Sequence, residues 1–143
     1  MFDYEYIGNL HVHSRHSDGT LTPAEIAGVA IRAGLDFVGL NDHDYMSGGL
    51  YLDEEGFYGD LLLLKGLEVG KRYHHYLAYD LKAMVSSDNA GPQQIIDEVN
   101  KQGGFGYLAH PFERGMPFLE KSVAYTWNDL SVRDFTGICI WNY

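Results

Sequence analysis

The chain has 143 residues, which is enough for one domain with a buried core but too few for two of ordinary size. Hydrophobic residues make up 45% of the sequence and aromatic residues 14%, a composition typical of a folded rather than a disordered chain. Twenty acidic and ten basic residues give a formal net charge of −10, which argues against a broad surface for duplex nucleic acid.

The first elements in the sequence form a strand, helix, strand unit. The apolar segment around residues 6–10 predicts a strand, and residues 36–40 predict a second one. Between them, Thr22 and Glu25 have the spacing of a capping box at the start of a helix, and Gly34 ends that helix. Because a helix connects the two strands, we expect them to be parallel.

The middle of the chain is less regular. Residues 45–60 are rich in glycine, tyrosine and acidic residues without clear periodicity, and they predict a surface excursion with at most a short helix. Residues 61–69 and 73–79 have strand character and follow each other closely. We therefore expect these two strands to form a hairpin.

The C-terminal part again alternates between helix and strand. Pro92 opens a helix, and residues 105–109 predict the next strand. Weaker helical character covers residues 116–124, and residues 135–141 predict a last strand. No repeat or linker divides the sequence, so we expect residues 1–143 to form a single α/β domain.

Potential metal ligands lie at or just past the ends of the predicted strands. His11 and His13 are separated by one residue, so on an extended backbone both imidazoles point to the same side and can bind one cation. His43, Glu68 and His110 end three later strands. Since the carboxyl ends of strands in a barrel-like α/β fold meet at one rim, we expect these side chains to surround one pocket.

Five short motifs give the sequence a family resemblance. They are His11-Val12-His13, His16-Ser17-Asp18-Gly19, Asn41-Asp42-His43-Asp44, Gly66-Leu67-Glu68 and Leu108-Ala109-His110-Pro111. In this order and spacing they resemble the polymerase and histidinol phosphatase (PHP) family, over residues 10–142. The resemblance implies a distorted (β/α)7 barrel that holds two or three divalent metal ions, and imidazole and carboxylate ligands suit zinc, manganese or iron.

The same resemblance implies a set of metal ligands, with Glu68 as the carboxylate that bridges two cations. The set comprises His11, His13, Asp18, His43, Glu68, His75 and His110. His75 fits the position before the strand better than His74, and alternation along a strand would send the two side chains to opposite faces.

Other polar residues lie close to these positions. His16 is open to three interpretations, as a ligand, as a hydrogen-bond partner of a ligand or as a solvated loop residue. We expect Asp42 and Asp44 to orient histidines or to form a loop turn rather than to bind metal directly. Arg15 and Arg114 can clamp a phosphate with paired hydrogen bonds, although most arginines are solvated surface residues.

The C-terminus departs from the family pattern. Cys139 stands where the family usually carries an acidic residue, and as the only cysteine it cannot form an intramolecular disulfide. The chain stops at Tyr143, before the Asp-x-His motif that completes the family's metal site. We therefore expect an incomplete, open barrel that associates with itself through its exposed strand edge.

The sequence as a whole predicts a metal-dependent phosphoesterase. A metal-bound hydroxide would attack the phosphate ester of a small metabolite or short nucleotide, with Glu68, His43, Arg15 and Arg114 as the catalytic residues. Two alternatives stay open, a non-catalytic PHP module and an amidohydrolase-like enzyme that cleaves C–N bonds. The sequence contains no membrane-spanning segment and no signal-peptide pattern, so we expect a cytoplasmic protein without a membrane partner.

Overall fold

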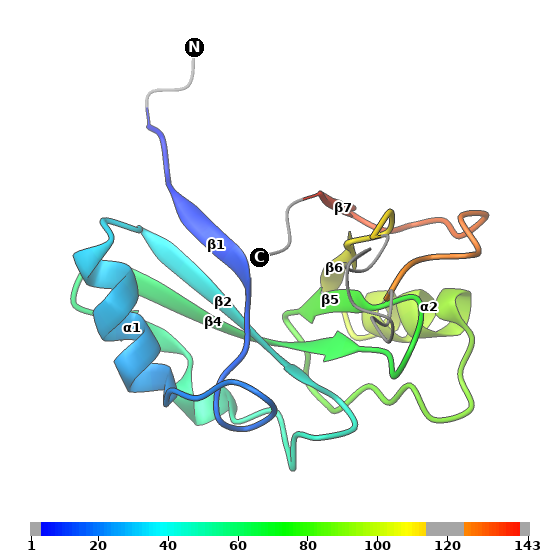
Figure 1. Ribbon diagram of the computed structural model, residues 1–143, viewed down its shortest axis with the longest axis horizontal. Coiled ribbons are helices and arrows are strands. Elements are labelled where there is room, and N and C mark those ends of the chain that lie inside the picture. The colour runs from blue at the N-terminus through cyan, green and yellow to red at the C-terminus, as the bar shows by residue number, and fades with distance from the viewer. Residues whose placement is uncertain (1–3, 114–124, 141–143) are drawn as a thin grey trace, which may run out of the picture.

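The computed structural model describes residues 4–113 and 125–140. These residues form a mixed seven-stranded sheet with two helices, which confirms the α/β class (Figure 1). The sheet runs in the order β1-β2-β4-β5-β6-β7, with β3 paired to β4 beside this path. The elements are β1 (Gly8–Val12), α1 (Pro23–Arg32), β2 (Phe37–His43), β3 (Gly56–Tyr58), β4 (Leu61–Val69), β5 (Tyr76–Tyr79), α2 (Pro92–Lys101), β6 (Phe105–Ala109) and β7 (Gly137–Cys139).

The sheet is open within the described residues, because its two end strands, β1 and β7, are not paired with each other. Helix α1 packs against β2 and β4, and helix α2 packs against β5 and β6. Figure 1 shows the two helices at opposite ends of the curved sheet. The arrangement is a half-barrel, as expected for an incomplete barrel, and it has fewer helices than a regular alternation of strand and helix would give.

The first strand, helix, strand unit forms as its sequence predicts. The Thr22 hydroxyl accepts a hydrogen bond from the Glu25 amide at 3.1 Å, and the Glu25 carboxylate accepts one from the Thr22 amide at 2.9 Å. After the helix, Gly34 has a φ of +74°, which lets the chain turn into β2. Ile26 and Ala30 are buried against the sheet, and β1 and β2 are parallel, as predicted.

The hairpin of β4 and β5 decides which residues reach the rim. Strand β5 is antiparallel to both β4 and β6, so β4 and β6 end at the rim where β5 begins. Glu68 near the end of β4, His75 just before β5 and His110 just after β6 therefore lie together. Since β5 is reversed, His75 reaches the rim from the amino end of its strand, whereas the other ligand candidates follow carboxyl ends.

Three apolar clusters support this rim. One lies under α1, and a second contains Ile95, Ile96 and Val99 of α2. The third lies on the other face of the sheet, where Leu77 and Tyr79 of β5 contact residues of the neighbouring strands. Apolar packing on both faces holds the strand ends in fixed positions for the polar groups above them.

Two segments differ from the sequence prediction. The excursion over residues 45–60 contains a 3₁₀ turn, Leu52–Glu54, but also strand β3, which the irregular sequence pattern does not reveal. The last strand is shorter than predicted, and the helical character predicted over residues 116–124 lies outside the described residues. None of the helices in the described ranges combines the length and the apolar character that crossing a bilayer requires.

Tyr79 ties three strands together beneath the rim. Its side chain is fully buried, and its hydroxyl contacts both the carbonyl oxygen of Leu10 in β1 and the side-chain amide of Asn41 in β2. Leu10 directly precedes His11, and Asn41 lies two residues before His43. The Tyr79 hydroxyl therefore fixes the spacing of two strands that carry histidines.

We expect Tyr79→Phe to lower the free energy of unfolding by about 1–3 kcal/mol, because the Leu10 carbonyl and the Asn41 amide each lose a buried hydrogen-bond partner. Chemical denaturation with urea would measure the change. Tyr6→Phe is the matched control, since Tyr6 is exposed, and it should leave the free energy unchanged. Equal stability of the Tyr79→Phe protein and the parent would contradict this role.

Candidate metal centre

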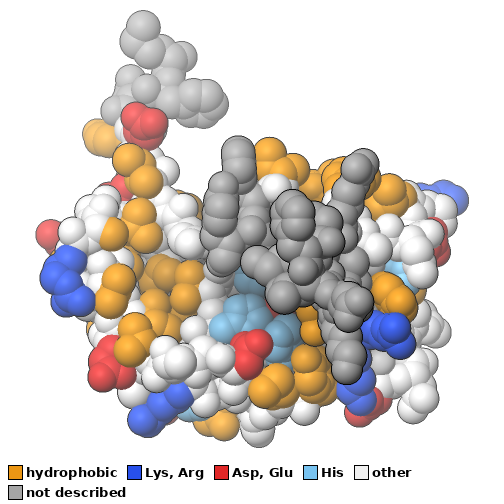
Figure 2. All heavy atoms as spheres, viewed as in Figure 1, with side chains coloured by type: hydrophobic (Ala, Val, Ile, Leu, Met, Phe, Trp, Pro, Cys, Tyr) orange, Lys and Arg blue, Asp and Glu red, His pale blue; other side chains and the backbone are white. Residues whose placement is uncertain are grey.

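A pocket of about 210 Å³ opens at the rim of the sheet. Five of its lining side chains are histidines, and Figure 2 shows histidine side chains gathered at the middle of this face beside an acidic group. Among the residues that the structure describes, the lining consists of His11, His13, Asp18, His43, Tyr45, Glu68, His75, His110 and Tyr125. Seven of these nine side chains can bind a metal ion.

Glu68 lies at the centre of this pocket and is 2% exposed. Its Oε2 atom faces three imidazoles, at 2.9 Å from His13 Nε2, 3.2 Å from His11 Nε2 and 3.4 Å from His43 Nδ1. The first two imidazoles also face each other, with 3.1 Å between their Nε2 atoms. Strands β1, β2 and β4 thus meet at one carboxylate oxygen.

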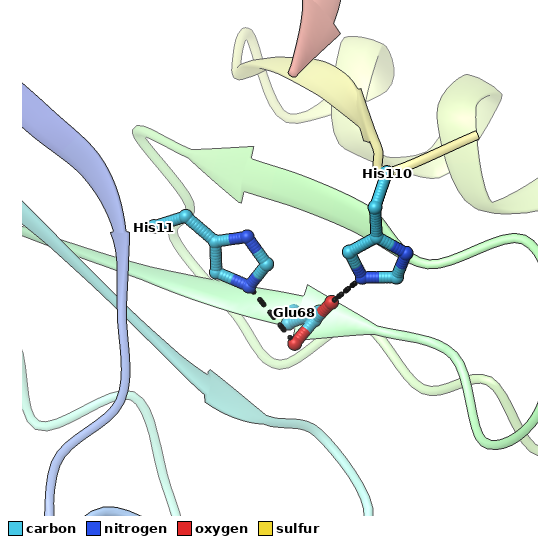
Figure 3. A group of neighbouring side chains, drawn as sticks. All are labelled: His11, Glu68 and His110. Atoms are coloured by element: carbon cyan, nitrogen blue, oxygen red, sulfur yellow. Dashed lines mark hydrogen bonds and ion pairs between the residues drawn. The ribbon is translucent and has the colours of Figure 1, made fainter. Parts of the chain in front are cut away.

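The other oxygen of Glu68 faces the second half of the sheet. Its Oε1 atom is 2.8 Å from His75 Nδ1 and 3.1 Å from His110 Nε2. Figure 3 shows His11 and His110 approaching Glu68 from opposite sides, one toward each oxygen. A carboxylate in this position can bridge two cations.

Asp18 adds a second carboxylate at the mouth of the pocket. Its Oδ1 atom is 2.7 Å from His13 Nδ1, and its Oδ2 atom is 3.5 Å from His43 Nε2. The Asp18 side chain is 52% exposed, in contrast to the buried Glu68. His13 consequently has one nitrogen facing each of the two carboxylates.

The donor atoms suit metal ions. Ligands that bind a tetrahedral zinc ion at about 2.1 Å lie about 3.4 Å from one another. The Nε2 atoms of His11 and His13 and the Oε2 atom of Glu68 are separated by 2.9–3.2 Å, close to that spacing. Three groups have ligand atoms within 4.8 Å of one another: His11, Glu68, His110; His13, Asp18, His43; and His43, Glu68, His75.

A buried nitrogen gives a further sign that the pocket fits cations. His75 Nε2 is buried and has no hydrogen-bond partner among the described residues. Leaving such a polar atom unpaired costs about 1–3 kcal/mol, so buried polar groups normally have a partner. A cation bound to His75 Nε2 would supply one. Together with the spacing of the other donor atoms, this open position fits the metal ions that the sequence predicts.

Glu68 and the surrounding imidazoles shift one another's pKa values. Burial by itself raises the pKa of Glu68, but hydrogen bonds with His11, His110, His13 and His75 lower it far more, so the pKa lies well below its usual range. Burial lowers the pKa of His13, yet hydrogen bonding and charge attraction from Glu68 outweigh it and raise the pKa overall. The charge of Glu68 thus favours the protonated form of His13 when no cation is present.

Two further imidazoles next to Glu68, those of His110 and His43, have pKa values shifted in opposite directions. Burial lowers the pKa of His110, but the hydrogen bond and charge of Glu68, the hydrogen bond with Tyr125 and the charge of Glu113 together raise it. The pKa of His43 is lowered, because burial dominates and the neighbouring His13 opposes a second positive charge. Burial therefore favours the neutral form of His43, the form that binds a metal ion.

The structure brings all seven expected metal ligands into one pocket, although their role as ligands stays a prediction. It does not bring Arg15 there, because this side chain is exposed and acts electrostatically on Glu25 at the start of α1. The expected contact of Arg15 with a phosphate in the pocket therefore has no support in the fold. Arg114 lies outside the described residues.

His75 and His74 have different surroundings, and the choice of His75 agrees with the structure. His75 faces Glu68, whereas His74 contacts Asn128 and packs edge-on against Trp127. The reason is not alternation along a strand, since β5 begins only at Tyr76. His74 instead has a φ of +61°, and this left-handed backbone turns its side chain away from the pocket.

His16 is not among the side chains that line the pocket. Its Nε2 atom is 3.0 Å from both carboxylate oxygens of Glu54, and its ring stacks on Tyr51 with 3.8 Å between centroids. Asp44 does not orient a histidine either, because its oxygens accept hydrogen bonds from the amide of Gly70 and from Ser87. Of the two interpretations, Asp44 thus fits the loop role.

The sequence does not reveal the part that Tyr125 and Trp127 play. The carbonyl oxygen of Tyr125 accepts a hydrogen bond from His110 Nδ1 at 2.7 Å, which directs His110 Nε2 toward Glu68. Trp127 donates its indole N–H to the carbonyl oxygen of His75 at 3.1 Å. Both residues are far from their partners along the chain, so no local pattern could have indicated these contacts.

Comparison with known proteins supports the fold. No protein-family model and no curated protein matches the sequence. Among solved structures, the chain is similar to a two-domain protein from Bacteroides vulgatus that contains a predicted PHP-like metal-dependent phosphoesterase, with a TM-score of 0.57 and 24% identity. The match covers 75% of this chain and 35% of that protein, so the chain spans about a third of its length. The half-barrel thus shares its fold with part of that protein and is consistent with an incomplete PHP-like barrel.

We expect zinc or manganese to raise the melting temperature of the protein, because an ion that binds only the folded state stabilises it by about 2.7 kcal/mol at 100 times its dissociation constant. Glu68→Gln should abolish most of this rise, since the carboxylate shared by five imidazoles is lost. Glu98→Gln, on the surface of α2, is the control and should retain it. An unchanged metal-induced shift in the Glu68→Gln protein would rule out the proposed centre.

Metal binding should release protons. His13 and His110 have raised pKa values, and a histidine must be neutral to bind a cation, so affinity should fall steeply as the pH is lowered from about 8 to about 6. Titration calorimetry in buffers of different ionisation enthalpy would count the protons released. A metal affinity independent of pH across this range would contradict the assignment of these two histidines as ligands.

Proposed function

We propose that this chain is a metal-dependent phosphoesterase that acts on phosphate esters of small metabolites or short nucleotides. The observation that carries the proposal is the buried Glu68 carboxylate, which has imidazole nitrogens within 2.8–3.4 Å of its two oxygens. The similarity to a fold that contains a predicted metal-dependent phosphoesterase supports the same reaction class. We further propose that the half-barrel is part of a distorted (β/α)7 barrel.

The charge of the pocket explains why metal ions are needed. Asp18 and Glu68 contribute two carboxylates, and no lysine or arginine is among the described residues of the lining. A phosphate dianion adds two further negative charges to this pocket, and bound divalent cations would offset them together with the carboxylates. A phosphoesterase in this fold therefore depends on metal for substrate binding as well as for chemistry.

The three ligand groups share members, which favours a centre of two or three ions over isolated sites. Glu68 belongs to two groups, and His43 also belongs to two. When bound, divalent cations supply an activated water at neutral pH and positive charge for the phosphoryl oxygens. Glu68 and the imidazoles would hold the cations, and Asp18 keeps His13 oriented.

Two tyrosines define the mouth of the pocket. Tyr45 packs near the His43 ring and Tyr125 near the His75 ring, each with 5.1 Å between centroids. Both are partly exposed, so their rings can contact the alcohol portion of an ester. The small volume of the pocket and the chain's negative charge favour small esters over duplex DNA.

The test is phosphate release from a panel of phosphate monoesters and short nucleotides, with the protein loaded with zinc, manganese or iron. We expect turnover that a chelator abolishes and that the metal restores. Glu68→Gln should lower kcat/KM on the order of 100-fold or more, because the cations lose their shared carboxylate. Glu98→Gln should behave like the parent.

Three other outcomes would each point elsewhere. Phosphate release that survives both the chelator and Glu68→Gln would refute a metal-dependent reaction in this pocket. Tight metal binding without turnover of any ester would favour a non-catalytic metal-binding module. Hydrolysis of cyclic amides in a parallel panel, without ester hydrolysis, would identify an amidohydrolase-like enzyme.

A further inference from the structure

The loop of residues 13–18 presents side chains to two different environments. His13 and Asp18 line the pocket, whereas the side chains of Ser14 and Ser17 point to a second group of polar residues. The loop is compact, because the carbonyl oxygen of Ser14 accepts hydrogen bonds from the amides of Ser17 and Gly19 at 3.1 and 3.0 Å. The position of this loop therefore fixes two of the expected metal ligands.

Asp42 holds the loop from the side away from the pocket. Its Oδ1 atom accepts hydrogen bonds from the Ser14 amide and the Ser17 hydroxyl, both at 2.8 Å, and its Oδ2 atom accepts one from the Ser14 hydroxyl at 2.8 Å. Asp42 and Ser14 are almost completely buried. Alternation along β2 explains the placement, since His43 points to the pocket and Asp42 to the opposite face.

A second anchor lies next to the first. Glu54 is paired with His16 of the same loop, and the ammonium group of Lys65 lies between the two anchors. Lys65 Nζ is 3.4 Å from Asp42 Oδ2 and 3.5 Å from Glu54 Oε2, and the Lys65 side chain is 1% exposed. One buried ammonium group is thus shared by both carboxylates that hold the loop.

Such a buried charge network contributes little net stability, because removing charges from water costs about as much as their attraction returns. Its main effect is to fix the position of the 13–18 loop, since charge-assisted hydrogen bonds are short and directional. We propose that Asp42, supported by Lys65, is a positioning residue that holds the 13–18 loop so that His13 and Asp18 reach the metal centre. The proposal rests on the metal-binding role of these two residues under the proposed function.

The other expected ligands do not depend on this loop. His11 belongs to β1, Glu68 to β4, and His110 follows β6. Loss of the Asp42 contacts should therefore weaken the His13, Asp18, His43 group selectively and leave the His11, Glu68, His110 group in place. A general loss of folding would affect both groups equally.

Trypsin provides a test that requires no metal, because the exposed Arg15 lies inside the loop. We expect cleavage after Arg15, mapped by mass spectrometry, to be about ten-fold faster or more in Asp42→Ala than in the parent, since three charge-assisted hydrogen bonds are lost. Asp42→Asn, which keeps one acceptor oxygen, should give an intermediate rate.

Asp44→Asn is the matched control, because Asp44 is also a buried carboxylate near the end of β2 but holds Gly70 and Ser87. Its cleavage rate after Arg15 should equal that of the parent. Ser17→Ala removes a single hydrogen bond to Asp42 and gives a milder test if Asp42→Ala does not fold. Parental cleavage rates after Arg15 in both Asp42→Asn and Ser17→Ala would overturn the proposal.

Metal stoichiometry is the second readout, measured by calorimetry with zinc and by the visible spectrum with cobalt. Asp42→Asn should bind one equivalent less tightly, by about ten-fold, with the remaining equivalents unchanged. Identical binding by the parent and the variant would overturn the proposal. If the parent binds no metal at all, the proposed function fails, while the cleavage rates still decide whether Asp42 holds the loop.

Discussion

The carboxylate of Glu68 is the group on which the rest of the structure depends. Removing a charge from water costs several kcal/mol unless nearby groups compensate for it, and here the compensating groups are imidazoles from different parts of the chain. Each half of the sheet contributes to one oxygen of the carboxylate. The buried charge is therefore compensated only when both halves of the sheet are assembled. The same assembly brings the expected metal ligands together.

Side chains on both faces of the sheet hold the strands that surround this carboxylate. Apolar clusters under α1 and α2 hold the strands, while Tyr79 fixes the spacing of β1 and β2 beneath the rim. Strand alternation then sends polar side chains to both faces, as with His43 and Asp42. Because neighbouring residues serve opposite faces, the ligands and the groups that hold them come from the same short stretches of chain.

Much of the site is predictable, because the ends of strands can be recognised in the sequence. Apolar runs end just before or at His11, His43, Glu68 and His110, and these side chains do meet. The close spacing of two strand-like segments also predicts the hairpin that reverses β5. The pairing of β5 with β6 and the contact of Tyr125 with His110 instead join distant segments, which no local pattern records. Arg15 shows another limit of local patterns, since His13 and Asp18 of the same loop line the pocket but the Arg15 side chain is exposed.

The hairpin of β4 and β5 has a consequence for how the pocket forms during folding. Glu68 and His75 are only seven residues apart along the chain, whereas Glu68 and His110 are separated by 42. Closing a short loop costs less conformational entropy than closing a long one, so the contact between Glu68 and His75 can form early from a local segment. His11 of β1 and His110 after β6 reach Glu68 only when the long-range strand pairing is complete. We therefore expect the pocket to form first at the hairpin of β4 and β5.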